Sequence, residues 1–345
     1  SYYLKLNIFR IITSMKKYDV YGIGAAIVDI EVVVSEHFLS KNKVEKGIMT
    51  LVDEERQHQI INALTSQKTP VKRNCGGSAC NSIVAASSFG SKTFYSGKVA
   101  DDWEGDFFVK DLKAAGVDFH NVAASEGTTG KCLVMITQDA ERSLNTFLGV
   151  SIDISSQEVD TKSLENSKWL YMEGYLVTDK ARTDVAINAM AYAKEKGVKT
   201  SLSLSDPYVV KVFSESLKSV IGEGIDLLFC NTDEARRFTG THTVEAAANV
   251  LKQYAKTFVI TRGPGGSLTY DGHELIHTPG VSTNAVDTNG AGDMFAGSFL
   301  YAISNGHDYA WAARFANAAA ALVVGQFGTR IEAIEYISLK QQFNI

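Results

Sequence analysis

The sequence predicts an α/β fold with a mainly parallel central sheet, helices on its faces and a small β-sheet lid. From Val20 onward, short apolar runs bounded by turn residues alternate with helical patterns, which is typical of βα units. Several helical patterns stop at a glycine, such as Gly90 or Gly197, as helices commonly do. Two β-rich regions interrupt the alternation and indicate a second, smaller sheet.

The individual elements follow from these patterns in order along the chain. Short apolar runs predict strands at 20–28, 92–97, 168–173, 199–204, 225–230 and 257–261. Helical spacing of apolar residues predicts helices at 79–89, 180–196, 207–221 and 243–255. Strands separated by helices can pair in parallel, because the helix carries the chain back across the sheet.

The two irregular regions predict a discontinuous lid. Four β-rich segments at 31–35, 47–53, 131–137 and 142–148 can form one sheet, and the last two fold as a hairpin around 138–141. We assign the lid to residues 31–53 and 119–150, and the α/β core to residues 15–30, 54–118 and 151–345. Residues 1–14 are expected to be an upstream extension, since Met15 leads directly into the first clean strand. Such a lid would cover the carboxyl edge of the core sheet, where open α/β sheets bind ligands.

Composition narrows the class of protein. The chain has 345 residues, with 34 basic and 39 acidic side chains and a net charge of -5. No basic stripe accompanies this charge, so we expect no nucleic-acid partner, and no apolar run approaches the roughly 20 residues of a membrane span. The 4 cysteines lack paired spacing, which favours a cytoplasmic setting. Monomer and homodimer both remain open.

Residues 287–293, Asp-Thr-Asn-Gly-Ala-Gly-Asp, carry the strongest chemical signal. A glycine-rich helix start leaves main-chain N–H groups unpaired, and the helix dipole adds positive character, so such a turn binds anions. Asp293 would lie in the first turn of that helix. It could take a proton from a hydroxyl while a phosphoryl group is held by the N–H groups of Gly290, Ala291 and Gly292.

Three further segments contain residues suited to small polar ligands. Gly76 and Gly77 open a helix and allow close backbone approach, and the Asn81 amide can both donate and accept. Residues 231–234, Asn-Thr-Asp-Glu, follow a strand and offer side chains for magnesium-bound water. Residues 261–267, Thr-Arg-Gly-Pro-Gly-Gly-Ser, form a candidate phosphate-side loop.

The order and spacing of these four motifs resemble the ribokinase (PfkB) family of carbohydrate kinases, over about residues 18–335. Asn289-Gly290 and Asn81-Ser82-Ile83 are most similar to the adenosine kinase branch. The resemblance implies a ribokinase-like fold and ATP-dependent phosphotransfer to an alcohol, with ATP and Mg²⁺ as cofactors. Many family members also bind K⁺ near the motif at 287–293.

By similarity to the family, each motif position acquires an expected role. Asp293 would be the general base beside an anion hole of Gly290, Ala291 and Gly292. Arg142, in the lid hairpin, would close over the phosphates as the lid excludes water. Asp29, at the end of the first strand, would clasp vicinal sugar hydroxyls, and further sugar contacts would come from Gly76, Gly77 and Asn81.

The resemblance also assigns the nucleotide side. Asn231 and Glu234 would take part in binding magnesium and phosphate, and Asp287 could contribute to a potassium site. ATP contacts are expected from Thr261, Gly263, Gly266 and Asn317. Glu173 departs from the adenosine kinase pattern, because it lies where ribokinases have a sugar-binding glutamate and the adenosine branch tends toward apolar residues.

Three functional hypotheses follow. The first is ATP-dependent phosphorylation of the 5′-hydroxyl of a purine nucleoside, adenosine to AMP before inosine or guanosine. The second is a kinase of a free sugar of the ribose or fructose type. The third is a non-catalytic ligand-binding regulator on the same scaffold, since a fold alone does not prove activity. An intact motif with Asp293 argues against the third hypothesis.

Overall fold

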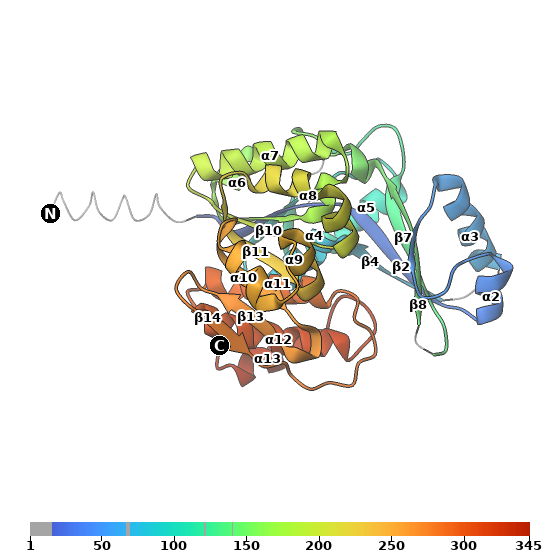
Figure 1. Cartoon of the computed structure of the whole chain (residues 1–345). Coiled ribbons are helices and arrows are strands. Elements are labelled where there is room, and N and C mark those ends of the chain that lie inside the picture. The colour runs from blue at the N-terminus through green and yellow to red at the C-terminus, as the bar shows by residue number, and fades with distance from the viewer. Residues whose placement is uncertain (1–15, 67–69, 121, 140) are drawn as a thin grey trace.

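The structure is a computed structural model that describes residues 16–345 except 67–69, 121 and 140. The extension predicted at residues 1–14 lies outside the described residues. Figure 1 shows a large α/β body with a smaller sheet projecting from one side of it. This arrangement is the ribokinase-like α/β fold with a lid that the sequence predicts.

The larger sheet contains nine strands within the described residues, in the order β14-β13-β12-β11-β10-β9-β1-β5-β6. Neighbouring strands are parallel, except that β13 is antiparallel to β12 and to β14. The strands span Tyr18–Ile23 (β1), Thr93–Ser96 (β5), Val117–Phe119 (β6), Ser167–Glu173 (β9), Lys199–Ser203 (β10), Ile225–Asn231 (β11), Ala255–Thr261 (β12), Ser267–Tyr270 (β13) and Leu275–Thr278 (β14).

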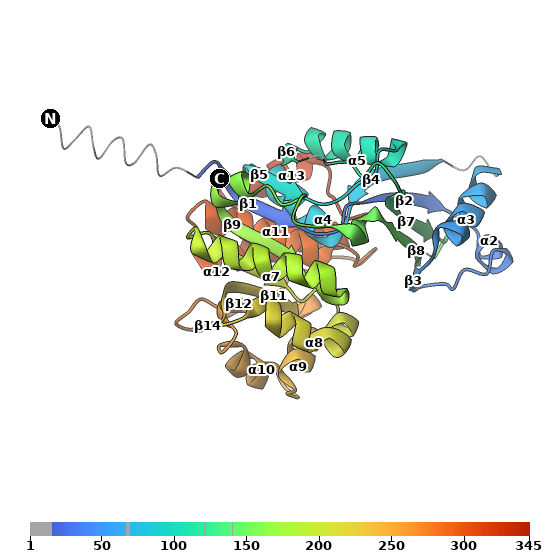
Figure 2. The ribbon, with the colours of Figure 1, turned by 90° about the horizontal axis from the view of Figure 1, so that it is seen from above.

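Helices cover both faces of this sheet (Figure 2). Along β9, Tyr171 packs into one hydrophobic cluster while Leu170 and Met172 pack into the other, because successive strand residues point to opposite faces. The face of Tyr171 carries α4 (Ser78–Phe89), α5 (Trp103–Ala114), α11 (Ala291–Ser304), α12 (Tyr309–Val324) and, behind them, α13 (Ala333–Gln342). The opposite face carries α6 (Thr161–Glu165), α7 (Lys180–Glu195), α8 (Pro207–Ile221), α9 (Thr232–Thr239) and α10 (Val244–Leu251).

The smaller sheet has the strand order β3-β8-β7-β2-β4. One face packs on α2 (Glu36–Lys41) and α3 (Glu54–Ser66), where Phe38 and Ile60 join Val28, Ile30 and Val32 in the main core. The alternate residues of β2 point the other way, toward the α/β body, and include Ile27 and Asp29. The strands span Ile27–Val33 (β2), Met49–Leu51 (β3), Val71–Gly76 (β4), Thr129–Ile136 (β7) and Arg142–Gly149 (β8).

The structure confirms the predicted hairpin and corrects several element boundaries. β7 and β8 are antiparallel, with Ile136 opposite Arg142. The single strand predicted at 20–28 is wrong: β1 ends at Ile23, and the chain turns at Gly24 into β2 of the other sheet, so Asp29 lies in the lid and not at the end of the first core strand. β4, which we assigned to the core, is a fifth lid strand. The helix predicted at 243–255 ends at Leu251, because β12 begins at Ala255.

Among the described residues, no helix combines the length and apolar character needed to cross a bilayer.

Candidate active site

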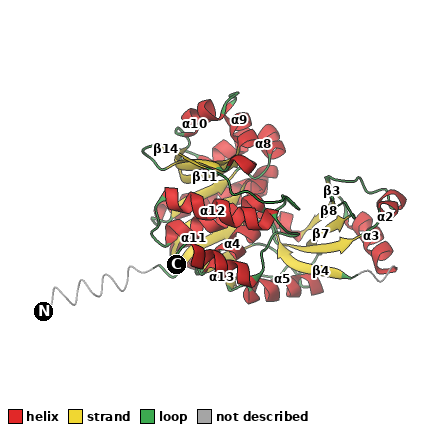
Figure 3. Ribbon diagram, turned by 90° about the horizontal axis from the view of Figure 1, so that it is seen from below, coloured by secondary structure: helices red, strands yellow, loops and turns green. Residues whose placement is uncertain are grey.

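A cavity of about 1250 Å³ lies between the lid and the carboxyl edge of the large sheet. Its walls come from the smaller sheet on one side, and from the ends of β9 and β11 and the starts of α4 and α11 on the other. Figure 3 shows the smaller sheet beside the helices α4, α5 and α11 of the body. The predicted site residues that line the cavity are Asp29, Gly77, Asn81, Glu173, Asn231, Glu234, Thr261, Gly290, Gly292 and Asp293.

Asp293 projects into this cavity from the first turn of α11. The Ser78 hydroxyl donates to its Oδ1 over 2.6 Å, and Asn81 Nδ2 donates to its Oδ2 over 3.3 Å. Asn81 is held at its other end by the Thr329 hydroxyl, which donates to Asn81 Oδ1 over 3.3 Å. Burial raises the pKa of Asp293 to about 6, against the opposing effect of these two hydrogen bonds. A carboxylate with that pKa is suited to act as a base near neutral pH.

The turn before α11 presents main-chain N–H groups beside Asp293. Gly290 adopts a left-handed conformation with φ of 77°, and a Cβ there would lie 2.9 Å from Thr329 Cβ, so only glycine fits. Gly290 and Gly292 line the cavity. The Ala291 N–H instead donates to the Thr288 carbonyl over 3.3 Å, and Ala291 is not part of the cavity wall. Gly290 and Gly292 thus lie at the cavity, and the anion hole predicted at residues 290–292 stays a prediction.

Asp29 faces the same cavity from the lid strand β2. A Cβ at Gly76 would lie 2.4 Å from Asp29 Cγ, so the glycine makes room for the carboxylate. Burial raises the pKa of Asp29 to about 7, the Glu31 carboxylate adds to the rise, and the Arg330 guanidinium opposes it. The tertiary structure thus brings a lid carboxylate to the cavity that Asp293 also lines.

Glu173 ends β9 with its side chain only 1% exposed. Its Oε1 accepts the Ala25 N–H over 2.9 Å and its Oε2 accepts the Ala79 N–H over 2.7 Å. Burial raises the pKa of Glu173 to about 7, although these two bonds oppose the rise. Each oxygen thus helps tie the β1–β2 crossing to the first turn of α4. Glu173 also lines the cavity, so its predicted contact with a sugar stays a prediction.

Asn231 and Glu234, at the start of α9, also line the cavity. They make a reciprocal capping box, in which Asn231 Oδ1 accepts the Glu234 N–H and Glu234 Oε2 accepts the Asn231 N–H, each over 2.9 Å. Asn231 Nδ2 also donates to Glu234 Oε1 over 2.7 Å. Burial raises the pKa of Glu234 to about 7. Because the side chains satisfy each other, they fit a magnesium ion through its water shell better than by direct ligation.

The other predicted ATP positions cluster one strand further along the sheet. Thr261 ends β12 and lines the cavity. Gly263 and Gly266 belong to the turn between β12 and β13, where a Cβ at Gly266 would lie 2.1 Å from the Thr278 carbonyl oxygen. The Asn317 amide donates to Ser267 Oγ and to the Pro279 carbonyl, over 3.2 and 3.3 Å. Gly263, Gly266 and Asn317 are not part of the cavity wall, so the structure leaves their predicted contact with ATP as a prediction.

Arg142 and Asp287 form a buried ion pair between the lid and the glycine-rich turn before α11. Arg142 Nε lies 3.0 Å from Asp287 Oδ2, and the guanidinium stands over the Phe327 ring. Asp287 also accepts the N–H groups of Asn289 and Gly328. The carboxylate predicted to help bind potassium is thus already surrounded by protein donors, one of them a cation. These residues therefore do not fit a potassium ion.

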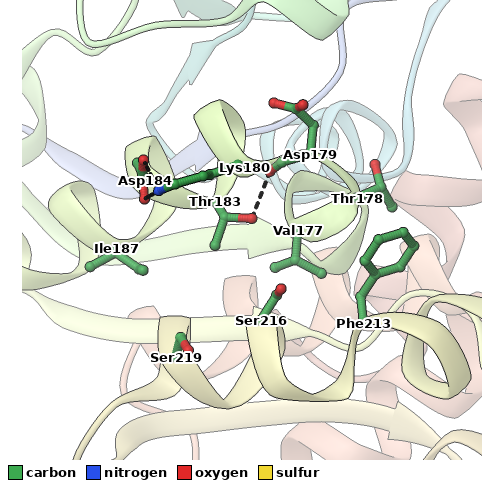
Figure 4. Close-up of a pocket in the computed structure, with 10 residues that line it drawn as sticks. All are labelled: Val177, Thr178, Asp179, Lys180, Thr183, Asp184, Ile187, Phe213, Ser216 and Ser219. Carbon is green, nitrogen blue, oxygen red and sulfur yellow. Dashed lines mark hydrogen bonds and ion pairs between the residues drawn. The ribbon is translucent and has the colours of Figure 1, made fainter.

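A second, smaller cavity of about 440 Å³ lies between α7 and α8 (Figure 4). Thr178 and Phe213 line both cavities. Its charged side chains are already engaged: Lys180 pairs with Asp184, and Asp179 caps α7. This cavity therefore offers fewer available charged side chains to a ligand than the large one.

Sequence reasoning missed three residues that shape the site. Ser78 and Thr329 hold Asp293 and Asn81, and Arg330 donates to the Cys75 carbonyl over 2.8 Å while pairing with Asp111 at 3.0 Å. Ser78 stands inside the glycine motif and could have been found from its helical spacing to Asn81. Thr329 and Arg330 carry no local signal, because their partners are more than 200 residues away in the sequence.

The fold and this site together define a small-molecule kinase: a cleft under a lid, a buried carboxylate and helix N-terminal amides beside it. The chain belongs to the pfkB family of carbohydrate kinases, whose model matches residues 46–335. The sequence resemblance to this family is thereby confirmed. Membership implies the use of ATP, normally together with Mg²⁺.

Known relatives include nucleoside and sugar kinases. Adenosine kinase 2 of Arabidopsis thaliana is 28% identical over 311 residues, which cover 83% of this chain and 88% of that protein. The 5-dehydro-2-deoxygluconokinase of Bacillus subtilis is 24% identical over 322 residues, covering 90% and 91%. The crystal structure of adenosine kinase from Sinorhizobium meliloti is 32% identical, with a TM-score of 0.84 over 94% of this chain and 99% of that one.

Proposed function

We propose that this kinase transfers the γ-phosphoryl group of ATP to the 5′-hydroxyl of a purine nucleoside, with adenosine as the preferred acceptor. The single observation that carries the proposal is the mixed character of the acceptor half of the cavity. The lid side of the cavity wall combines the Asp29 carboxylate with apolar side chains, namely Ile27, Met49, Leu51, Leu144 and Leu148. A nucleoside matches both parts, since its ribose presents vicinal hydroxyls and its base presents apolar faces.

The lid strand β3 adds weight to this assignment. Met49 and Leu51 line the cavity and are 50% and 61% exposed. Exposed apolar side chains at a cleft are typical of a surface that becomes covered by a ligand. A free pentose or hexose would cover less of this apolar surface than a nucleoside, whose base adds apolar faces. The adenosine kinases among the relatives point the same way.

The proposed chemistry assigns a task to each part of the site. Asp293 accepts the proton of the 5′-hydroxyl as that oxygen attacks the γ-phosphorus, and the bond from phosphorus to the departing ADP oxygen breaks. The N–H groups of Gly290 and Gly292 hold the transferring phosphoryl group. Arg142 supplies positive charge beside the same turn; its Nη1 and Nη2 have no hydrogen-bond partner within the described residues, although the side chain is buried.

Asp29 and the magnesium-side pair complete the arrangement. Asp29 accepts from the 2′- and 3′-hydroxyls, and Gly77 and Asn81 lie beside them. Asn231 and Glu234 would hold magnesium through water, and magnesium bound with ATP supplies charge neutralisation of the phosphates. Glu173 acts indirectly, because its carboxylate holds the main-chain N–H groups of Ala25 and Ala79 in place.

An acceptor screen tests the proposal. Purified protein with ATP and Mg²⁺ is offered adenosine, inosine, guanosine, ribose, fructose and 5-dehydro-2-deoxygluconate, while ADP release and the phosphorylated product are measured. We expect the highest kcat/KM for adenosine. A sugar acid or free sugar that outperforms every nucleoside would overturn the nucleoside assignment, and ADP release without acceptor preference would overturn specific phosphotransfer.

Two adenosine analogues sharpen the result. 5′-Deoxyadenosine lacks the proposed attacking oxygen and should bind without forming product. 2′-Deoxyadenosine lacks one hydroxyl of the Asp29 clasp and should lose kcat/KM by about 10- to 100-fold, the effect of one hydrogen bond to a charged group. Equal use of adenosine and 2′-deoxyadenosine would show that Asp29 does not bind the ribose.

A further inference from the structure

The Ser78 hydroxyl stands where an acceptor hydroxyl would meet the base. Ser78 is the first residue of α4, is only half-buried and lines the large cavity. Its hydroxyl donates to Asp293 Oδ1 over 2.6 Å. The bond that an acceptor alcohol must make to a general base is therefore already made by an alcohol of the protein.

The two oxygens of the Asp293 carboxylate are held in different ways. Oδ2 accepts from Asn81, and Asn81 is anchored in turn by the Thr329 hydroxyl. Oδ1 accepts only from Ser78 among the side chains of the described residues. Rotation about one side-chain bond removes the Ser78 oxygen from this position, whereas releasing Asn81 requires two hydrogen bonds to break. Oδ1 is therefore the oxygen that can exchange partners.

We propose that Ser78 is a positioning residue: it holds the Asp293 carboxylate in the acceptor-free enzyme and gives up that place to the acceptor hydroxyl. The proposal rests on the proposed function, in which Asp293 is the general base. Its consequence is that the free enzyme keeps its base aligned and ionised, and the acceptor replaces an existing hydrogen bond instead of having to orient the carboxylate.

Because of its electrostatic surroundings, the hydrogen bond from Ser78 should have a measurable effect on the pKa of Asp293. The titratable groups that face Asp293 are Asp29 on β2, Tyr171 and Glu173 on β9, and Tyr175 on the 3₁₀ turn at Gly174–Thr178. All four are acids, so none of them stabilises the ionised form of Asp293. The hydrogen bonds from Ser78 and Asn81 are the interactions that oppose the effect of burial on the Asp293 pKa. Loss of the Ser78 hydroxyl should therefore raise that pKa.

The first measurement uses the free enzyme and needs no acceptor. The Asp293 carboxyl carbon is titrated by ¹³C NMR in the wild type and in Ser78→Ala, with Asp293→Asn to assign the signal. We expect the pKa to rise by about 0.5 to 1 pH unit in Ser78→Ala, the size expected when one hydrogen bond to a charged group is partly replaced by water. Ser78→Gly also lacks the hydroxyl and should shift in the same direction.

The second measurement separates the free enzyme from its complex. The pH dependence of kcat/KM reports groups of the free enzyme, and that of kcat reports groups of the complex. With the acceptor that the screen identifies, Ser78→Ala should move the acidic limb of kcat/KM upward by the same 0.5 to 1 pH unit, a loss of about 3- to 10-fold at low pH. The acidic limb of kcat should stay in place, because the acceptor has replaced Ser78 in the complex.

Two control variants and two outcomes decide the matter. Ser78→Thr keeps a hydroxyl and should restore the wild-type limb. Ser87→Ala removes a hydroxyl from the same helix, one that donates to the Ala115 carbonyl over 2.8 Å, and should shift neither profile. An unchanged Asp293 pKa in Ser78→Ala and Ser78→Gly overturns the proposal, and so does an equal shift in kcat and kcat/KM. An acceptor screen without a substrate would contradict the proposed function but leave the NMR titration decisive for Ser78.

Discussion

Replacing Glu173 with glutamine should remove a loss of stability at alkaline pH and lower the activity at the same time. Glutamine keeps the shape of the protonated glutamate and one acceptor oxygen, but it brings an NH₂ group toward one of the two main-chain N–H donors. Either Ala25 or Ala79 then loses its partner, so the start of α4 is held less firmly. We therefore expect weaker acceptor binding in Glu173→Gln, seen as a higher acceptor KM.

The size of the stability effect follows from the pKa of Glu173, which burial raises from 4.5 to about 7. The folded state then binds more protons than the unfolded state between these two values, so stability falls as the pH rises through that window. This difference in pKa between the folded and the unfolded state corresponds to about 3 kcal/mol of unfolding free energy, because the side chain is only 1% exposed. Glutamine does not titrate, so the variant should escape this loss.

Urea unfolding of the ligand-free protein at pH 5 and pH 8, followed by tryptophan fluorescence, measures the effect. Relative to the wild type, Glu173→Gln should gain about 2 to 3 kcal/mol of unfolding free energy between pH 5 and pH 8. Glu195→Gln changes an exposed glutamate in the same way and should follow the wild type. Parallel pH dependences of the wild type and Glu173→Gln would refute the reasoning.

Three further substitutions test the proposed roles. Asp293→Asn should retain ATP binding, measured by calorimetry, and lose about 10²- to 10⁴-fold in kcat, the contribution of a general base; near-normal turnover would exclude that role. Asp29→Ala should raise the acceptor KM far more than the KM for ATP, and an equal effect on both would misplace the acceptor site. Arg142→Met should lower kcat by about 10²-fold or more without changing acceptor affinity, because it removes charge from beside the phosphoryl group; a change in acceptor KM alone would contradict this. Circular dichroism of each variant checks that the fold is retained.

Much of the fold could be predicted because βα units are local. Each strand of the large sheet is a short apolar run and each helix has its own apolar spacing, so these elements are visible without their neighbours. The errors occur where the chain changes sheets. The run at 20–28 is continuously apolar, and nothing in it indicates that the turn at Gly24 sends Ile27 and Asp29 into the lid. The strand β4 was missed because Val71–Gly76 is mostly polar and therefore does not look like a strand. Its partner strand β2 lies about 40 residues earlier in the sequence.

By itself, the sequence determined the glycine-rich turn and the position of Asp293 at the start of α11, because a helix N-terminus is built from consecutive residues. The tertiary structure alone decided what surrounds that carboxylate. Ser78 and Asp293 are 215 positions apart, and Arg142 meets Asp287 only because the lid folds over the body. Burial also depends on the whole fold, so the raised pKa values of Asp29, Glu173 and Asp293 could not be read from local residue types. The proton affinity and the alignment of the Asp293 carboxylate are properties of the assembled cleft, whereas the sequence motif supplies only the chemical groups.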